Sequence, residues 1–521
     1  MILMKPRAHI SFVLFLLSPF LLTGQQENVD LNIIFRIKQE GFRNSQIREL
    51  AFWMTDYVGP RLPASEGMKR AYDYTSRKLK EIGLENVRVE PYGETGPGWN
   101  NHKTYVAMTA PYYSHLIGTP KAWTPGTNGL LKSEVALVEI RDTADFARYR
   151  GQLKGKIVVT PPADEQPFSF REQTDRYTDE QLAEMARYNP TQRRYGNFDI
   201  ARYMAERELR NTINAFIASE GVAAILTAGG SFGTVRSADV STREPQGTVV
   251  TEVILTSEHH GRMVRLLQHG VKVEAEMEIT NTFDDSEKND YNVIGEIPGT
   301  DRDLKDQVVL IGAHLDSWHG GTGANDNAAG CITMMEAMRI LKAIGFKPRR
   351  TVQIALWGSE EQGLLGSRGY VSTYLGNTET RELKTGYHNF SAYFNIDNGS
   401  GKIRGIYLME NDMIRPLFEA WFKPFNDMGA GTITLRNTGG TDISSFDALG
   451  LPAYQFIQDP AGYDKGYHSN MDTYERLMLD DMMFNAVVVA SFVYHAAMRD
   501  DLLPRKPLPP KREPSRPPMA P

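Results

Sequence analysis

Short apolar runs alternate with longer amphipathic stretches through the second half of this chain. From Tyr291 onward the apolar runs have the length of buried strands and lie at 308–313, 351–357, 391–396, 403–409 and 452–456. Between them, apolar residues recur at helical spacing near 327–345, 361–376, 412–427 and 475–499. This alternation predicts an α/β fold in which a mixed, largely parallel sheet is sandwiched by helices.

The first half of the chain contains two segments with different patterns. Residues 27–84 show the helical spacing of apolar positions. From about Pro120 to Asn289 the pattern changes to short strand-like runs at 135–140, 156–160, 223–227 and 249–255. Because this segment carries none of the clustered chemistry described below, we interpret it as an inserted, β-rich module.

Both ends of the chain differ from this pattern. Lys5 and Arg7 precede an apolar run over 10–22, and a more polar exit follows at 23–26. This order predicts a cleaved signal peptide and therefore a secreted or periplasmic protein; an uncleaved anchor is the alternative. No other apolar stretch has the length of a bilayer span, so we expect no stable membrane span after signal cleavage. The end of the chain, rich in Pro, Lys and Arg, is expected to be disordered.

Composition and charge narrow the classes of function. The 521 residues carry a formal net charge of -6, and Lys and Arg are scattered rather than gathered in a stripe, so nothing favours nucleic-acid binding. Cys331 is the only cysteine and lies in an apolar run, which indicates a core residue rather than a nucleophile with a base partner. A chain of this length can bury enough apolar surface to fold without a disulfide.

Histidine and acidic residues gather at the ends of the predicted strands. In open α/β sheets, ligands bind beyond the carboxyl ends of the strands. Five candidates fall at such an end or in a comparable loop: His314, Asp326, Glu361, Asp397 and His468. Imidazole nitrogens and carboxylate oxygens are favoured zinc ligands where no thiolate is available. The set suits two zinc ions that share one carboxylate and are each completed by one His and one further carboxylate.

Two further acidic residues lie beside these candidates. Asp316 follows His314 by two residues, so on an extended backbone it points to the same side and can hold the second ring nitrogen. Glu360 and Glu361 are adjacent and point in different directions, so one can bind metal while the other meets the water. Taken singly, a strand-end Asp is more often a helix cap, but the joint pattern favours a metal site. Three histidines lack such context and are interpreted as surface or core residues: His319, His388 and His495.

Four motifs resemble those of the co-catalytic di-zinc exopeptidase family, which includes bacterial leucyl aminopeptidase, glutamate carboxypeptidase and carboxypeptidase Q. They are His314-Leu-Asp316, Gly323-Ala-Asn-Asp-Asn327, Glu360-Glu-Gln-Gly-Leu-Leu-Gly366 and His468-Ser-Asn-Met-Asp472. The likeness is specific over about 293–500 and looser over 27–120. Within the inserted module, Gly155-Lys-Ile-Val-Val159 and the segment 218–225 are similar to a protease-associated domain.

The resemblance implies a division of the chain into five parts. They are a signal peptide (1–24), an N-terminal part of the peptidase domain (25–119), a protease-associated-like insert (120–290), the catalytic zinc peptidase domain (291–502) and a disordered Pro-rich tail (503–521). The oligomeric state is not determined by the sequence, and a homodimer stays open.

The family pattern also assigns roles to the candidate residues. It implies that Asp326 bridges two zinc ions, that Glu361 and His468 complete one site, and that His314 and Asp397 complete the other. In the implied mechanism, metal-assisted amide hydrolysis, a general base takes a proton from the attacking water and returns it to the leaving amine. That position is occupied by Glu360.

Two details of the bridging region carry further expectations. Several relatives have a second Asp where this chain has Asn327, although others tolerate Asn at that position. Relatives also have a non-proline cis peptide after the bridging Asp. The resemblance therefore implies a cis peptide at Asp326–Asn327.

The implied function is that of a zinc-dependent exopeptidase acting on small peptides. Aminopeptidase or dipeptidase action is favoured because no basic cluster near the motifs marks a pocket for a substrate carboxylate. Carboxypeptidase Q-like or glutamate carboxypeptidase activity is the alternative. Two further classes are disfavoured: a non-catalytic receptor-like relative, since all five ligand positions and Glu360 hold competent residues, and an aminoacyl cyclase, since the chain has an insert.

Overall fold

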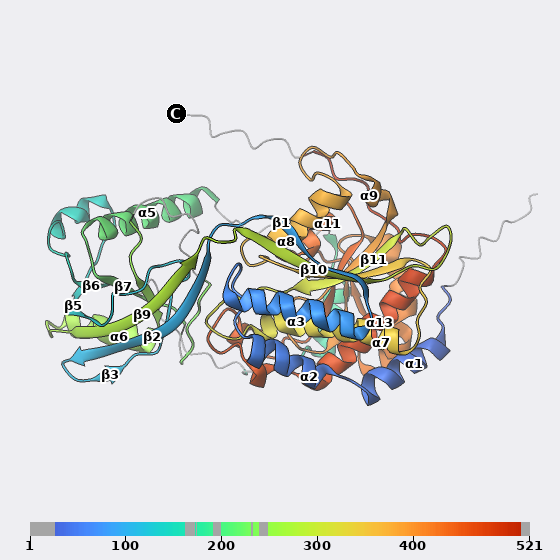
Figure 1. Ribbon diagram of the computed structural model, residues 1–521, viewed down its shortest axis with the longest axis horizontal. Helices are drawn as coiled ribbons and strands as arrows, with labels where there is room; N and C mark the ends of the chain where they lie inside the picture. Colours follow the sequence, from blue (N-terminus) through green and yellow to red (C-terminus); the bar gives the residue numbers. More distant parts are fainter. Residues whose placement is uncertain are drawn as a thin grey trace, which may run out of the picture.

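Two eight-stranded sheets organise the part of the chain that the computed structural model describes, which is residues 27–161, 172, 174–190, 200–230, 233–238 and 248–511. Figure 1 shows the two sheets in two bodies joined where β1 leads into β2 and β9 leads into β10. The predicted signal peptide and the last part of the predicted tail lie outside the described residues.

The first sheet is mixed, as predicted. Its spatial order is β1 (Glu85–Glu94), β10 (Asn289–Ile297), β12 (Thr351–Trp357), β11 (Val308–His314), β13 (Phe390–Asn395), β16 (Ala453–Gln458), β14 (Ile403–Tyr407) and β15 (Thr432–Thr434). The four central strands β12, β11, β13 and β16 run parallel to one another. They are buried along almost their whole length, which explains why their sequences are nearly continuous apolar runs.

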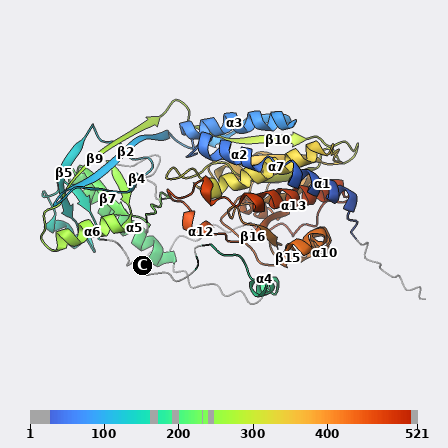
Figure 2. The ribbon, with the colours of Figure 1, turned by 90° about the horizontal axis from the view of Figure 1, so that it is seen from below.

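Helices cover both faces of this sheet (Figures 1 and 2). One face carries α1 (Leu31–Arg43), α2 (Ile47–Phe52), α3 (Glu66–Ile82), α7 (Ala329–Ala343) and α13 (Leu479–Met498), and α10 (Arg415–Phe422) packs beside α13. The other face carries α8 (Leu365–Tyr370), α9 (Thr385–Asn389) and α11 (Ile443–Asp447). The short helix α12 (Tyr463–Gly466) precedes His468. The predicted sandwich of helices around a mixed sheet is confirmed.

Shorter helical turns occur in both bodies. They are Trp53–Val58, Thr143–Arg148, Ala324–Ala328, Val371–Leu375, Asp412–Ile414, Lys423–Met428 and Tyr474–Arg476. Within the described residues, α13 is the one helix that is long and apolar enough to cross a membrane by length and composition. Since 78% of its apolar window is buried inside the protein, packed on α7 and α1, its composition is that of a core helix.

The second sheet has the order β3 (Ser114–His115), β2 (Gly98–Ala110), β9 (Glu274–Asp284), β5 (Leu131–Leu137), β6 (Ile157–Val159), β7 (Ala224–Ala228), β8 (Glu252–Leu255) and β4 (Gly118–Pro120). Strands β5 to β8 are parallel. Helix α6 (Ser257–Gln268) packs on β5, β6 and β7, and α5 (Ile200–Ser219) contributes Phe216 and Ile217 to a core with Val158 and Ile225. This sheet starts at Gly98, ahead of the predicted insert boundary at residue 120, because β2 pairs with β9 along its length.

One stretch of the predicted insert lies against the first sheet instead. Helix α4 (Asp179–Ala186) packs on the edge strand β15, and Figure 2 shows it well away from α5 and α6. The Arg176 guanidinium bridges the buried carboxylate of Asp459 and Asp481, at 2.8 and 2.7 Å. We use "second-sheet module" below for the described residues from Gly98 to Asp284 other than 174–190.

The beginning of the predicted disordered tail packs on the surface of the first body. Leu503 is buried, and the Lys506 ammonium forms an ion pair with Asp447. The Arg505 guanidinium lies 5.0 Å from the centre of the Tyr387 ring. Residues 503–511 therefore differ from the expectation of disorder, because their cationic groups find an acidic and an aromatic partner.

Candidate metal centre and active site

The five predicted ligands lie together at the carboxyl end of the parallel strands. His314 is the last residue of β11, Asp397 follows β13, and Glu361 lies in the turn after β12. Asp326 lies in the turn that leads into α7, and His468 follows α12. Their donor atoms form two clusters, His314–Asp326–Asp397 and Asp326–Glu361–His468, each with its atoms within 4.8 Å of one another. Asp326 is common to both.

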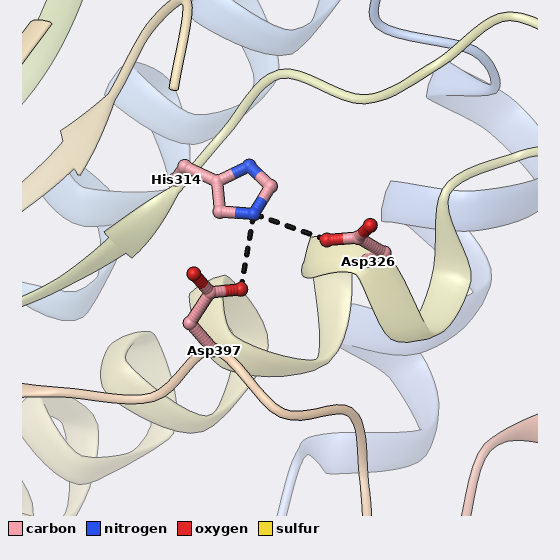
Figure 3. Close-up of side chains that lie close together, drawn as sticks. All are labelled: His314, Asp326 and Asp397. Carbon is pink, nitrogen blue, oxygen red and sulfur yellow. Dashed lines mark hydrogen bonds and ion pairs between the residues drawn. The ribbon is translucent and has the colours of Figure 1, made fainter. Parts of the chain in front are cut away.

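The first cluster is built around one ring nitrogen of His314. Its Nε2 lies 3.1 Å from Asp326 Oδ1 and 3.2 Å from Asp397 Oδ1. Figure 3 shows both carboxylates turned toward this nitrogen, Asp326 from a helical turn and Asp397 from a loop. The other ring nitrogen, Nδ1, lies 3.1 Å from the backbone oxygen of Asp316, so the ring is held from both sides.

The second cluster uses the remaining oxygen of Asp326. His468 Nε2 lies 3.0 Å from Asp326 Oδ2 and 3.0 Å from Glu361 Oε2. The two oxygens of Asp326 thus face two different histidines. A carboxylate whose two oxygens face two different histidines has the geometry of a bridging ligand.

The turn that presents Asp326 is held by a neighbouring carboxylate. The backbone N–H groups of Asn325 and Asp326 donate to Asp472 Oδ1 and Oδ2, at 2.7 and 3.0 Å. Gly323 begins the turn with φ +60, and a Cβ at this position would lie 2.3 Å from Ser317. The peptide Asp326–Asn327 is cis, as the resemblance implied.

Asp316 acts on two neighbouring elements of the site. Its carboxylate accepts the N–H groups of Glu360 and Glu361, at 3.0 and 3.2 Å. Its Oδ1 also lies 3.5 Å from His314 Nδ1, whereas the hydrogen bond of that nitrogen goes to the Asp316 backbone oxygen. Asp316 therefore fixes the turn that separates Glu360 from Glu361, which the spacing alone did not indicate.

Three buried side chains near the site were not predicted from the sequence, because the motifs assign them no role. Arg61, Trp318 and Asp442 are buried, and both Asp442 oxygens lack a hydrogen-bond partner among the described residues. Trp318 Nε1–H donates to Glu361 Oε2 at 2.8 Å. Of the three histidines set aside, His495 is buried, His319 is half-buried and His388 is exposed. His319 Nε2 is paired with the backbone oxygen of Pro120 at 2.7 Å.

The Arg61 guanidinium holds the loop that joins His314 to Asp326. It is fully buried and donates to four backbone oxygens, those of Gly59, Leu315, Thr322 and Gly323, at 2.6–3.1 Å. Its position in the rigid sequence Gly59-Pro-Arg-Leu-Pro63 is the one feature of the sequence that marks it.

Replacing Arg61 by methionine is expected to lower the free energy of unfolding by at least about 3 kcal/mol, because several buried carbonyls lose their donors at once. Arg70→Met is the matched control, since Arg70 is exposed and donates to one carbonyl, that of Val58. Urea denaturation of both variants measures the difference. Equal stability losses in the two variants would contradict this role for Arg61.

Burial dominates the electrostatics of the cluster. Burial, followed by the charge of Asp326, raises the pKa of Glu361 to about 8. Burial also raises the pKa of Asp397 to about 6, against the attraction of His314. Burial lowers the pKa of His468, but the hydrogen bonds to Asp326 and Glu361 outweigh it and raise that pKa to about 9.

Glu360 has the most perturbed carboxyl group of the site. Burial raises its pKa to about 11; the charge of His314 opposes this shift, and the carboxylates of Asp397 and Asp442 add to it. A carboxylate in such surroundings stays ionised only beside additional positive charge. The set as a whole therefore calls for cations.

The donor atoms fit such cations. Glu361 Oε1 is buried and has no hydrogen-bond partner among the described residues, and the buried Asp326 Oδ2 faces the ring nitrogen of His468 at 3.0 Å. Each cluster offers one imidazole nitrogen and two carboxylate oxygens, the donor types that zinc prefers in the absence of thiolates. The carboxylates of Asp326, Asp397 and Glu361 together offset most of the charge of two divalent ions.

Known proteins resemble this chain in sequence and in fold. Residues 292–493 match the family model described as peptidase family M28. Carboxypeptidase Q from Homo sapiens is 26% identical over 474 residues, which cover 89% of this chain and 87% of that protein. Two solved structures share the fold. A peptidase M28 precursor from Shewanella amazonensis has a TM-score of 0.65 and 24% identity, over 92% of this chain and 99% of that one. A zinc aminopeptidase from Bacillus subtilis has a TM-score of 0.56 and 18% identity, over 88% and 96%.

The fold, the carboxylate of Asp326 that both clusters share, and these matches together indicate the class of the protein. It is a zinc exopeptidase, as the resemblance of the four motifs implied. More particularly, its residues 292–493 are similar to peptidase family M28.

Proposed function

We propose that this protein is a di-zinc exopeptidase that removes terminal residues from small peptides. The observation that carries the proposal is the pair of clusters that share Asp326, each with its own histidine and its own second carboxylate. In this proposal Glu361 and His468 hold one zinc ion with Asp326, and His314 and Asp397 hold the other with the same residue. Glu360 is the general base.

When bound, the two zinc ions would lower the pKa of a water and polarise the scissile carbonyl. The residues of the chain then have separate tasks. Glu360 accepts the proton of the attacking water at its carboxylate and delivers it to the nitrogen of the leaving amine. Asp316 keeps that carboxylate in place, because it holds the N–H groups of Glu360 and Glu361. The buried surroundings of the site exclude competing water.

The surroundings of the site favour aminopeptidase or dipeptidase action. A carboxypeptidase needs a cation for the substrate carboxylate, and the donors of Arg61 are engaged by backbone oxygens. A free α-amine, in contrast, suits a cleft rich in carboxylates. Carboxypeptidase Q-like action is the second candidate, because that relative aligns over 89% of the chain.

The proposal extends to partners and location. The partner is a peptide substrate, and export through the predicted signal peptide would place the enzyme outside the cytoplasm. The two disfavoured classes make different predictions: a receptor-like relative would bind peptide without hydrolysis, and an aminoacyl cyclase would release a cyclised amino-terminal residue.

A scan of fluorogenic amino-acid amides and dipeptides blocked at either end tests the proposal. We expect hydrolysis of substrates with a free amino terminus, loss of activity with a chelator and recovery with added zinc. Hydrolysis only of dipeptides blocked at the amino terminus would select the carboxypeptidase alternative. No hydrolysis and no tightly bound zinc would refute the di-zinc enzyme.

A further inference from the structure

The second-sheet module contacts one of the two ligand clusters. Within the described ranges, the side chains hydrogen-bonded to His314 and Asp397 all belong to the domain of the first sheet. The loop of His468 and the side chain of Glu361, by contrast, lie against residues of the module or against groups packed on it. The two clusters are therefore supported differently.

A two-bond bridge joins the module to the loop of His468. The Ser237 N–H donates to the His468 backbone oxygen at 2.8 Å, and the Asn470 N–H donates to the Val235 oxygen at 3.1 Å. Between these bonds, Arg236 and Ser469 are antiparallel bridge partners. His468 itself has φ +55, a left-handed conformation that costs a non-glycine residue free energy unless its surroundings impose it.

The side chain of Asn470 strengthens this bridge. Its Oδ1 accepts the Val235 N–H at 2.7 Å, and its Nδ2 donates to the Gly233 oxygen at 3.2 Å. The Ser237 Oγ also accepts the N–H of Gly320, at 3.2 Å. Residues 233–237 thus hold the loop of His468 and also contact the loop that leads to the shared ligand Asp326.

A second contact reaches Glu361 through Trp318. The Trp318 Nε1–H donates to Glu361 Oε2 at 2.8 Å. The ring of Trp318 lies edge-on to the ring of His468, with 5.9 Å between the two ring centres. The same ring is part of a buried cluster with Trp99 and Trp123 of the module. A tryptophan held in this way keeps its N–H directed at the ligand oxygen.

We propose that the second-sheet module is a positioning element for one metal site: it holds His468 and Glu361 in place for the zinc ion they share with Asp326. The other site, with His314 and Asp397, forms without it. This inference rests on the proposed function, since it presumes that both clusters bind zinc. It assigns the module a role in metal binding that is separate from any role in recognising substrate.

Weakening the contact should then lower the affinity of one zinc ion and leave the other unchanged. Loss of a group that orients a metal ligand typically lowers metal affinity by about 10–100-fold. We expect a change of this size for the weaker-bound ion in Asn470→Ala and in Trp318→Phe. The second variant keeps an aromatic ring in the cluster and removes the N–H.

The experiment compares these variants with two matched controls in the full-length chain. Arg236→Ala alters an exposed side chain in the same bridge, and Trp99→Phe removes an N–H that donates to the Thr124 oxygen in the same cluster. Zn²⁺ is titrated calorimetrically into metal-stripped protein, and zinc content is measured after dialysis. Thermal melts of the stripped proteins show whether each variant folds.

The expected result is two binding events in the wild type and both controls, with one event weakened selectively in Asn470→Ala and Trp318→Phe. Unchanged affinities in both variants would overturn the inference, as would an equal loss at both sites. If Asn470→Ala does not fold, Trp318→Phe decides alone. Absence of zinc binding in the wild type would refute the proposed function itself, a result distinct from the others.

Discussion

Replacing Glu360 by glutamine is expected to lower kcat by about 10²–10⁴-fold, the usual contribution of a positioned general base, and to leave zinc binding intact. Glutamine matches glutamate in size but cannot accept the water proton. Glu360 belongs to neither ligand cluster, and its N–H remains bonded to Asp316 in the variant. Initial rates on the best substrate and elemental analysis of the same preparation measure the two quantities.

The neighbouring substitution Glu361→Gln is the matched control. It makes the same chemical change one residue away but removes the charge of a ligand in the cluster with Asp326 and His468. Zinc content should fall toward one ion per chain. A wild-type rate in Glu360→Gln would place the base elsewhere, and loss of zinc from that variant would make Glu360 a ligand.

Much of the first sheet could be predicted because its strands are buried on both faces. The run 351–357 coincides with β12, and 308–313 falls one residue short of the end of β11 at His314. Continuous burial requires continuous apolar sequence, so such strands are visible without knowledge of their neighbours. The sequence predicted a mixed, largely parallel sheet, but it did not predict the order of the strands, since pairing depends on contacts between distant segments.

The helices on the surface of the sheet were harder to predict. The expected helix at 412–427 is divided into α10 and flanking turns, and Pro424 lies at the break. A proline has no backbone N–H and disfavours helical continuation at the preceding residue. The expected helix at 361–376 begins only at Leu365, because the N–H groups of Glu360 and Glu361 are bonded to Asp316 and the chain turns there.

The ligands of the site could be predicted because each lies in a short motif next to a strand. The residues that hold the loops of these ligands could not be predicted. Arg61 and Ser237 act on loops that lie 262 and 231 residues away in sequence, through backbone atoms that no side-chain pattern records. The bridge between residues 235–237 and 468–470 pairs two irregular loops, so neither periodicity nor composition marks it.

The bridging carboxylate should have the largest effect on the metals. Asp326→Asn is expected to remove both zinc ions and to lower kcat/KM by at least about 10³-fold, since metal catalysis contributes several kcal/mol to the barrier. Oδ1 of Asp326 faces His314 and Oδ2 faces His468, so one substitution removes charge from both clusters. Asp464→Asn, an exposed aspartate paired with Lys465, is the control with the same chemical change.

Loss of the metals in Asp326→Asn should occur without loss of the fold. The turn is held by Asp472 through the N–H groups of Asn325 and Asp326, and by the conformation of Gly323, none of which requires the Asp326 carboxylate. The metal-stripped variant and metal-stripped wild type should therefore melt at the same temperature, while added zinc raises the melting temperature of the wild type alone. Two zinc ions retained by Asp326→Asn would show that each cluster binds its ion independently, and Asp326 would then not be a bridge.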